Sequence, residues 1–292
     1  MKISYLIFVH KNFAQIQRLI SNLNDEGVNF FIHISETGDA VYQECTEGFA
    51  DFPNVHFIKN RFKIWWGTFS LVDAILSSVR EIVYSGVDYE RLVLLSGQDY
   101  PIKSNEFIRS FFIRNSDKNY IEYFSLSAPN KWTNASGYFN DKQRIENYYF
   151  TYRSKVICIP VKRKLPYSFT PYGGSLWWNL NKECIEYMIG FIENAHKFID
   201  FMKHTYIPDE VFFQTLLLNS PMRSTIVNTD LRYINWEKAN PTPPAVLMSE
   251  DFDTLSASTA LFARKFDMDH DPKIFDLVDQ NLLFLPAGSK SA

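Results

Sequence analysis

Two adjacent carboxylates stand at the start of an apolar, aromatic segment, Ile207-Pro208-Asp209-Glu210-Val211-Phe212-Phe213-Gln214-Thr215. Proline followed by acidic residues is typical of a helix N-terminus, where the helix dipole favours negative charge. That role accounts for one carboxylate and not readily for both. Glu210 is therefore a candidate general base, and an ordinary helix start is the alternative.

Two adjacent cations lie between apolar residues near the end of the chain, in Leu261-Phe262-Ala263-Arg264-Lys265-Phe266-Asp267. Arginine offers a planar fork and lysine a point charge, a combination that suits a diphosphate. The alternative is a surface pair whose flanking phenylalanines lie in the core. We predict that Arg264 and Lys265 bind phosphate.

Two further segments carry side chains suited to a hydroxyl-rich ligand. Leu94-Leu95-Ser96-Gly97-Gln98-Asp99-Tyr100-Pro101-Ile102 follows an apolar stretch that reads as a buried strand, and loops after parallel strands commonly carry sites. Asp99 could bind a sugar hydroxyl there or only close a turn. In Tyr172-Gly173-Gly174-Ser175-Leu176-Trp177-Trp178-Asn179-Leu180, glycines permit close backbone approach and indoles offer flat faces for sugars.

The elements that must position these residues alternate between strand and helix patterns. The predicted strands are 3–9, 30–34, 55–58, 91–95 and 119–123, and the predicted helices are 14–23, 69–85, 105–114, 182–203 and one that begins at Pro208. This alternation favours βαβ units and an α/β fold with a mostly parallel central sheet. The pattern shows no internal repeat.

Composition indicates a folded domain and excludes several classes of protein. The 292 residues are 46% hydrophobic, which supports a sizeable core and argues against general disorder. A formal charge of -3 gives no attraction to nucleic acid. Cys45, Cys158 and Cys184 have neither the number nor the spacing of a disulfide framework or a zinc site, so we expect reduced thiols.

Eight segments, in this order, resemble glycosyltransferase family fourteen, the core-2/I-branching β-1,6-N-acetylglucosaminyltransferases and peptide O-xylosyltransferases. They are Phe8-Val9-His10, Phe31-Ile32-His33, Trp66-Gly67-Thr68-Phe69-Ser70, 96–101, 174–178, 208–215, Leu231-Arg232-Tyr233-Ile234-Asn235-Trp236 and 262–267. The resemblance implies a GT-A-type, Rossmann-like fold and transfer with inversion at the anomeric carbon. It also implies a nucleotide-sugar donor, handled without the metal-binding Asp-x-Asp motif of other GT-A enzymes.

The resemblance implies roles for individual residues. Glu210 would be the catalytic base. The donor would contact Val9, His10, Ser35, Trp66, Arg264 and Lys265, and the sugar or acceptor would contact Asp99, Trp177, Asp209 and Trp236. Four of these residues have a plainer alternative. His10 could be a core histidine, Trp66 could pack against a helix start, and Trp177 and Trp236 could be ordinary hydrophobic packing.

The nucleotide base and the sugar stay open at this level. Ser35 stands where the family usually carries an aspartate near the nucleoside, so the uridine donor that the resemblance implies is less firmly indicated. N-acetylglucosamine and xylose are equally compatible with the quoted segments. Asp267-Met268-Asp269-His270-Asp271 has Asp-x-Asp spacing, but it aligns with a stretch that carries no metal in the family. We therefore expect no metal and no other cofactor.

We expect one catalytic domain over residues 1–285, with a nucleotide-sugar half to about residue 125, an acceptor half from about 126, and a disordered tail at 286–292. The first residues read as a buried strand, so we expect a bacterial-type cytoplasmic form, or one peripheral at the inner face of the membrane. The partners would be the donor and a glycan acceptor, and the sequence does not indicate an oligomeric state. A non-catalytic carbohydrate-binding protein is the main alternative. A hydrolase is a weaker one, because adjacent helical residues such as Asp209 and Glu210 do not readily flank one bond.

Overall fold

The computed structural model describes residues 1–133, 141–152, 155–237 and 244–284, and its centre is a seven-stranded sheet in the order β12-β6-β11-β4-β1-β2-β3. The strands are β1 (Ile3–Val9), β2 (Val28–Ile34), β3 (Val55–Phe57), β4 (Arg91–Ser96), β6 (Asn119–Ile121), β11 (Trp178–Asn181) and β12 (Ile226–Val227). Strand β11 is antiparallel to both neighbours, and the other pairings are parallel. The predicted α/β class with a mostly parallel central sheet is confirmed.

Three smaller sheets complete the strand structure of the described residues. They pair β5 (Tyr100–Pro101) and β13 (Arg232–Ile234) with β14 (Phe262–Arg264), β7 (Phe124–Ser125) with β10 (Tyr172–Gly173), and β8 (Tyr148–Tyr152) with β9 (Lys155–Ile159). The sheet of β13, β14 and β5 matters for the site because it brings residues 262–266 to the carboxyl end of β4. The backbone N–H of Phe266 donates to the carbonyl of Gln98 at 2.9 Å.

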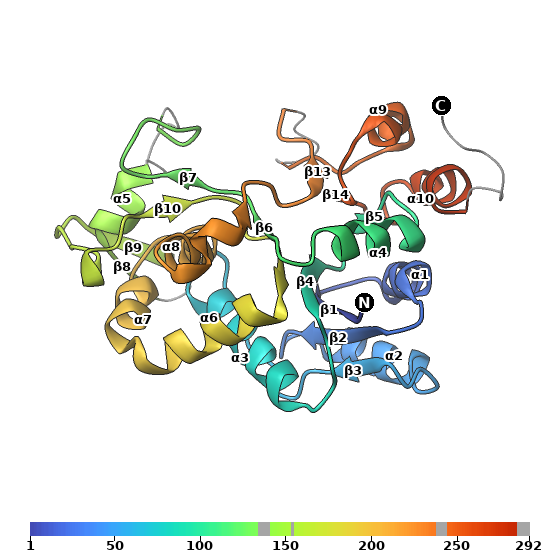
Figure 1. Ribbon diagram of the computed structural model, residues 1–292, viewed down its shortest axis with the longest axis horizontal. Helices are drawn as coiled ribbons and strands as arrows, with labels where there is room; N and C mark the ends of the chain where they lie inside the picture. The colour runs from blue at the N-terminus through green and yellow to red at the C-terminus, as the bar shows by residue number, and fades with distance from the viewer. Residues whose placement is uncertain (134–140, 153–154, 238–243, 285–292) are drawn as a thin grey trace.

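Helices cover both faces of the central sheet (Figure 1). One face packs against α1 (Phe13–Leu23), α2 (Asp39–Gly48), α4 (Asn105–Arg114), α9 (Phe252–Ala257) and α10 (Lys273–Val278), and the other against α3 (Ser70–Tyr84), α5 (Asp141–Glu146), α6 (Lys182–Asn194), α7 (His196–Lys203) and α8 (Phe212–Leu218). Short 3₁₀ turns span Pro166–Ser168, Pro208–Glu210, Pro221–Thr225 and Ser249–Asp251, and a π-turn spans Asp279–Leu283.

Strand β1 shows why the sheet is buried on both sides. Its sequence is apolar almost throughout, and alternate side chains enter opposite cores, with Tyr5 and Ile7 in one and Leu6 in the other. A strand covered on both faces by helices reads as a continuous apolar run rather than an alternating one. The register then places Val9 opposite Ile34, so β1 and β2 end side by side.

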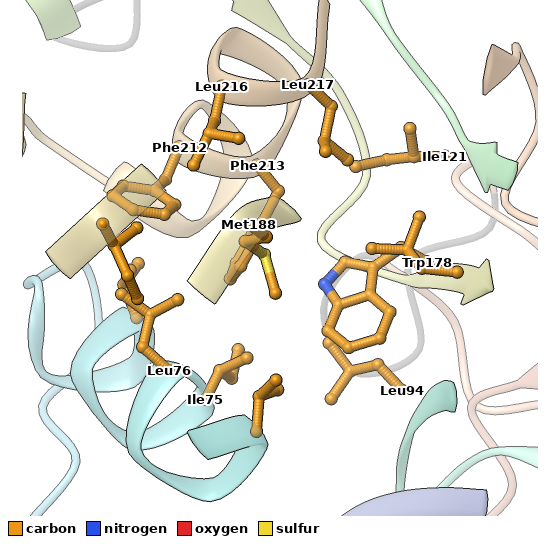
Figure 2. Close-up of a cluster of buried hydrophobic side chains, with 14 of the residues drawn as sticks. Ile75, Leu76, Leu94, Ile121, Trp178, Met188, Phe212, Phe213, Leu216 and Leu217 are labelled. Atoms are coloured by element: carbon orange, nitrogen blue, oxygen red, sulfur yellow. The ribbon is translucent and has the colours of Figure 1, made fainter. Parts of the chain in front are cut away.

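The core on the α8 side anchors the segment that carries Glu210. Phe212 and Phe213 are fully buried, and Figure 2 shows them among side chains of α3, α6 and β11. The ring centroids of Phe213 and Trp178 lie 6.0 Å apart. Trp178 is itself fully buried, so this indole belongs to the core and offers no face to a ligand.

The predicted elements match the observed ones closely where the pattern is long. The strand at residues 3–9 and the helix at 105–114 have the predicted bounds. The helix predicted for 182–203 is two helices, because the chain leaves helical geometry at Ala195 (φ -98°, ψ 43°). The helix predicted to begin at Pro208 is a 3₁₀ turn followed by α8, because Val211 is non-helical. Helix α2 was not predicted.

Other predictions about organisation stay open. The donor and acceptor halves remain a prediction, although β11 and β12 from the second half lie in the same sheet as β1 and β4. The predicted tail at 286–292 lies outside the described residues. No helix within the described ranges has both the length and the apolar character needed to cross a membrane.

Candidate active site

A cavity of about 460 Å³ opens where three parallel strands end, and we call it the cationic cavity. Its wall includes Val9 at the end of β1, His10 directly after it, Ser35 after β2, and Ser96 at the end of β4. Parallel strands present their carboxyl ends at one edge of a sheet, so these residues meet although they lie far apart in sequence. The remaining lining residues are Phe8, Thr37, Ile64, Trp66, Leu71, Ile75, Leu94, Gln98, Leu176, Trp177, Arg264 and Lys265.

All six predicted donor-binding residues line this one cavity. Sequence segments that span more than 250 residues are therefore brought to a single site. Their contacts with a donor stay predictions. Trp66 is exposed, with 72% of its surface accessible.

Arg264 is held in place before any ligand binds. Its guanidinium carbon lies 4.2 Å from the ring centroid of Trp177, and its Nε lies 3.8 Å from Oδ2 of Asp99. Its Nη2 donates to Oγ of Ser96 at 3.4 Å. Trp177 was predicted on the sugar or acceptor side, but it lines the cationic cavity and contributes a flat face behind the guanidinium.

Lys265 has no counter-ion within the described part of the chain. Burial and the neighbouring Arg264 guanidinium both lower its pKa, because each disfavours a second positive charge there. The pKa of His10 is also lowered, first by burial and then by Lys11, which favours the neutral imidazole. A phosphate that entered the cavity would neutralise the unpaired positive charge of Lys265.

Asp99 cannot contact a ligand in this structure, which corrects the prediction that it binds a sugar hydroxyl. The side chain is fully buried and lines neither this cavity nor the one described below. Its Oδ2 accepts hydrogen bonds from the backbone N–H of Ser96 at 2.7 Å and from the Ser96 hydroxyl at 2.5 Å, which closes the turn after β4. Its Oδ1 faces Nε of Arg232 at 3.3 Å. Asp99 instead pairs with two arginines, Arg232 and Arg264.

A second cavity, of about 450 Å³, lies on the other side of these arginines, and we call it the carboxylate cavity. Its lining residues are Glu122, Lys131, Trp132, Gly174, Ser175, Glu210, Asp230, Arg232, Ile234 and Trp236. Arg232 lines this cavity and Arg264 the cationic one, and both face the Trp177 ring and the Asp99 carboxylate. The two cavities therefore share one wall. Trp236 is 55% exposed and lines the carboxylate cavity, and its contact with a sugar or acceptor stays a prediction.

The turn that presents Glu210 is held from both ends. Ile207 adopts φ 48°, an uncommon conformation for a β-branched residue, and its N–H donates to the carbonyl of Gly67 at 3.1 Å. The carbonyl of Glu210 accepts from the N–H of Gly174 at 2.9 Å. A Cβ atom on Gly174 would lie 1.9 Å from the Glu122 carbonyl oxygen, so only glycine fits this approach.

Two buried polar residues of α8 tie the turn to the same glycine segment. The side-chain amide of Gln214 donates to the carbonyl of Ser175 at 2.6 Å. The hydroxyl of Thr215 donates to the carbonyl of Tyr172 at 3.0 Å and accepts from that residue's N–H at 3.1 Å. These bonds explain why polar residues follow the buried phenylalanines in the Glu210 segment.

The carboxylate of Glu210 is partly engaged and partly free. Its Oε2 accepts from Nη1 of Arg144 at 2.8 Å, and the Arg144 guanidinium lies 4.1 Å from the ring centroid of Trp132. Its Oε1 has no hydrogen-bond partner in the described ranges, and the side chain is 29% exposed. Burial raises the pKa of Glu210, while Arg144 opposes the increase. Oε1 of Glu210, whose pKa is raised, thus remains available to accept a proton.

The other carboxylates differ from Glu210. Glu122 is paired through Oε1 with Lys131 at 2.7 Å and accepts the N–H of Ser175 through Oε2 at 3.1 Å. Asp209, predicted to bind the sugar or acceptor, lines neither cavity, because the turn that aims Glu210 into its cavity directs Asp209 elsewhere. Burial, with Glu210 as a second cause, raises the pKa of Asp209 to about 7.

The Asp-x-Asp spacing at Asp267 and Asp269 is accounted for by an ion pair. Lys11 contacts Oδ2 of Asp267 at 2.6 Å and Oδ2 of Asp269 at 3.1 Å. Within the described ranges, no group of three or more histidine, cysteine or acidic residues is arranged to hold a metal ion.

Sequence reasoning missed most of the carboxylate cavity. Arg232 was available, since it lies within a segment that had been singled out, Leu231–Trp236. Glu122, Lys131, Trp132 and Arg144 lie in a stretch without a long periodic pattern, and their role appears only through contacts with Glu210 and Ser175.

Comparisons with known proteins indicate the family. Xylosyltransferase 2 of Rattus norvegicus is 26% identical over 300 residues, which cover 96% of this chain and 34% of that protein. Xylosyltransferase 1 of Rattus norvegicus is 26% identical over 240 residues, covering 81% of this chain and 28% of that protein. The chain thus spans about a third of the length of these relatives. The apo structure of mouse xyloside xylosyltransferase 1 covers 90% of this chain and 97% of its own at 13% identity, and its TM-score of 0.41 is too low to carry an argument.

A family model also matches most of the chain. The Core-2/I-Branching enzyme family matches residues 3–255, a range that runs from β1 through most of α9 and includes Glu210. The chain belongs to the core-2/I-branching enzyme family.

Proposed function

We propose that this chain transfers a sugar from a nucleotide-sugar donor to a hydroxyl of a glycan or glycoprotein acceptor, with inversion at the anomeric carbon. The observation that carries the proposal is the pair of cavities on either side of the Arg232, Arg264 and Trp177 wall. One cavity offers Lys265, which has no counter-ion in the described ranges, beside Arg264, and the other offers a carboxylate with one free oxygen. A diphosphate and an acceptor hydroxyl are the groups that these two environments suit.

In this mechanism Glu210 accepts the proton of the acceptor hydroxyl through Oε1 while that oxygen attacks the anomeric carbon. The bond between the anomeric carbon and the diphosphate oxygen breaks in the same displacement, on the opposite face of the sugar. General-base assistance of this kind typically contributes about 10²- to 10⁴-fold. Arg144 would keep the carboxylate in position through the 2.8 Å contact to Oε2.

The leaving diphosphate gains negative charge as the bond breaks. Arg264 and Lys265 would stabilise that charge from fixed positions, since Arg264 is already packed against Trp177. Fixed cations can take the part that a divalent ion has in other nucleotide-sugar enzymes, so we propose that transfer is independent of metal. Activity that disappears in EDTA and returns with manganese would contradict this part.

The donor is proposed to be a UDP-sugar, with xylose or N-acetylglucosamine as the sugar. The relatives named above are xylosyltransferases, and the family is named for branching enzymes, which supports both sugars without choosing between them. Ser35 and Thr37 line the cavity where the nucleoside would enter, and their hydroxyls lie 3.2 Å apart. They offer hydroxyl groups, rather than a carboxylate, to the nucleotide base.

Calorimetric titration with UDP, GDP, CDP and TDP in EDTA tests the proposal most directly. We expect UDP to bind without metal and to be followed by turnover of a UDP-sugar in the presence of a glycan acceptor. Preference for another nucleotide would move the specificity away from uridine. Binding of none of them would favour a non-catalytic carbohydrate-binding protein on the same fold.

A further inference from the structure

Exposed apolar side chains are concentrated in one short part of the sequence. Twelve large hydrophobic residues are exposed among those described, and five of them fall between residues 152 and 167. They are Tyr152 (56%), Ile157 (37%), Ile159 (39%), Val161 (58%) and Tyr167 (48%). Scattered exposed apolar residues are normal, but a cluster of this density marks an interaction surface.

The β8–β9 hairpin places several of these residues on one side. Its register pairs Phe150 with Ile157 and Tyr148 with Ile159, so these four residues share a face. At the inner end of that face the Tyr148 ring stacks on His204 at 4.2 Å, whereas Ile157 and Ile159 are exposed. The opposite face packs inward, since Tyr149 is buried and stacks on Tyr206 at 5.3 Å.

The same stretch of chain is basic. Residues 147–182 contain six lysines and arginines and no acidic residue, although the chain as a whole has 33 acidic residues and a charge of -3. Lys162 is 65% exposed in its side chain, and Lys164 is also exposed. Lys162 contacts Glu146 at 2.5 Å, and Lys164 has no partner in the described ranges.

Arg163, between these two lysines, anchors the hairpin to the rest of the protein. Its guanidinium donates to the carbonyls of Phe201 at 2.7 Å, Asn147 at 2.8 Å and Ile145 at 2.9 Å. It therefore connects the hairpin to α5 and α7, and Figure 1 shows β8 and β9 at the edge of the molecule beside these helices. Because α5 also carries Arg144, the partner of Glu210, the exposed hairpin and the carboxylate cavity belong to the same side of the molecule.

We propose that Tyr152, Ile157, Ile159, Val161, Lys162 and Lys164, which we call the hairpin surface, dock onto an anionic lipid bilayer. Isoleucine and valine would enter the boundary between headgroups and acyl chains, tyrosine would lie at headgroup level, and the lysines would face anionic phosphates. A second copy of this chain is a poorer partner for the same surface, because it would bring like charges together. Docking here would hold the carboxylate cavity near a membrane-borne acceptor.

Flotation with phospholipid vesicles tests this proposal. We expect the wild-type chain to bind vesicles of phosphatidylcholine with about one-third phosphatidylglycerol and to bind pure phosphatidylcholine much less, with binding that weakens as salt is added. The double variant Lys162→Gln/Lys164→Gln should lower the partition coefficient roughly tenfold or more. Ile157→Ser/Ile159→Ser should lower it by at least about tenfold, because two apolar side chains no longer enter the bilayer.

Matched controls come from exposed residues elsewhere. Ile113 is 51% exposed on α4 and Lys273 is exposed on α10, so Ile113→Ser and Lys273→Gln should leave vesicle binding unchanged. None of the four variants touches either cavity, so nucleotide titration reports that each is folded, independently of vesicle binding. The proposal is overturned if anionic vesicles do not bind, if the hairpin variants bind as wild type does, or if sedimentation shows a dimer that Ile157→Ser/Ile159→Ser dissociates.

Discussion

The two cavities differ both in charge and in how the chain builds them. The cationic cavity is lined by His10, Arg264 and Lys265 without any carboxylate. The carboxylate cavity is lined by three acidic residues together with Lys131 and Arg232. Only the wall of Trp177 and the two arginines separates a site suited to an anion from a site suited to proton removal. Asp99 lies within this wall and contacts both arginines.

The construction of the cavities differs as much as their charge. The cationic cavity forms at the ends of regular parallel strands, whose register places Phe8 beside both His33 and Ser96. The carboxylate cavity forms from loops and turns that are held by single contacts, such as Gly174 to Glu210 and Arg144 to Glu210. Substitutions in the cationic cavity should therefore change binding mainly by removing charge. Substitutions in the carboxylate cavity should change activity mainly by altering the geometry of the site.

Glu210→Gln should produce the largest effect on transfer. The amide keeps the shape of the side chain but cannot accept the acceptor's proton, so we expect kcat to fall by about 10²- to 10⁴-fold. Donor affinity should stay within a factor of about two, because the cationic cavity is unchanged. Turnover of a radiolabelled nucleotide sugar, with calorimetry for the donor, measures both.

Glu122→Gln is the matched control, since Glu122 lines the same cavity with both oxygens already bonded. Its effect should fall on the acceptor KM rather than on kcat. An equal loss of kcat in the two variants would contradict the assignment of Glu210 as the base.

Lys265→Ala should give the next largest effect, and it acts on the other cavity. Removing one charge-assisted contact to the diphosphate should cost about 2 to 4 kcal/mol, seen as weaker binding of the nucleoside diphosphate. Calorimetry in EDTA measures this loss directly. Lys273→Ala, which removes an exposed lysine on α10, should bind as wild type does. If Lys265→Ala also binds as wild type does, the cationic cavity is not the phosphate site.

Sequence reasoning predicted the cationic cavity better than the carboxylate cavity for a physical reason. Val9, His10 and Ser35 follow apolar strands whose parallel pairing could be inferred from the pattern, and such pairing determines where strand ends lie. Arg264 and Lys265 could be singled out because cations between buried phenylalanines need an anion. Both inferences use local sequence together with a regular sheet.

The errors have a complementary origin. Asp99 carries the right functional group at the end of a strand, but the turn after β4 and the neighbouring Arg232 use both of its oxygens. Arg144 lies in the short helix α5, and nothing in its local sequence indicates that it pairs with a residue 66 positions away. Long-range partners of this kind are decided by tertiary packing, which local periodicity does not encode.

Arg144→Gln should alter the pH dependence of transfer rather than donor binding. Glu210 must be ionised to accept a proton, so kcat/KM should decline as the pH falls through its pKa. Burial raises that pKa and the guanidinium lowers it, so removing the guanidinium should move the acidic limb to higher pH. Arg144→Lys keeps a positive charge and should retain most of the original limb. If Arg144→Gln lowers the rate but leaves the acidic limb of the pH profile at the same pH, Arg144 only supports the local fold.

Trp66→Ala should have the smallest effect, and it tests where the cationic cavity ends. Trp66 is 72% exposed at the cavity wall and meets Tyr206 edge-on, with ring centroids 6.1 Å apart. Loss of one exposed aromatic face should weaken nucleotide binding by about 2- to 10-fold, because such contacts contribute about 0.5–1.5 kcal/mol. The adjacent Trp65 packs on Lys63 and does not line the cavity, so Trp65→Ala is the matched control. Equal losses in the two variants would place Trp66 outside the donor site, and Phe8 and Trp177 would then be the aromatic residues at the wall of the cationic cavity.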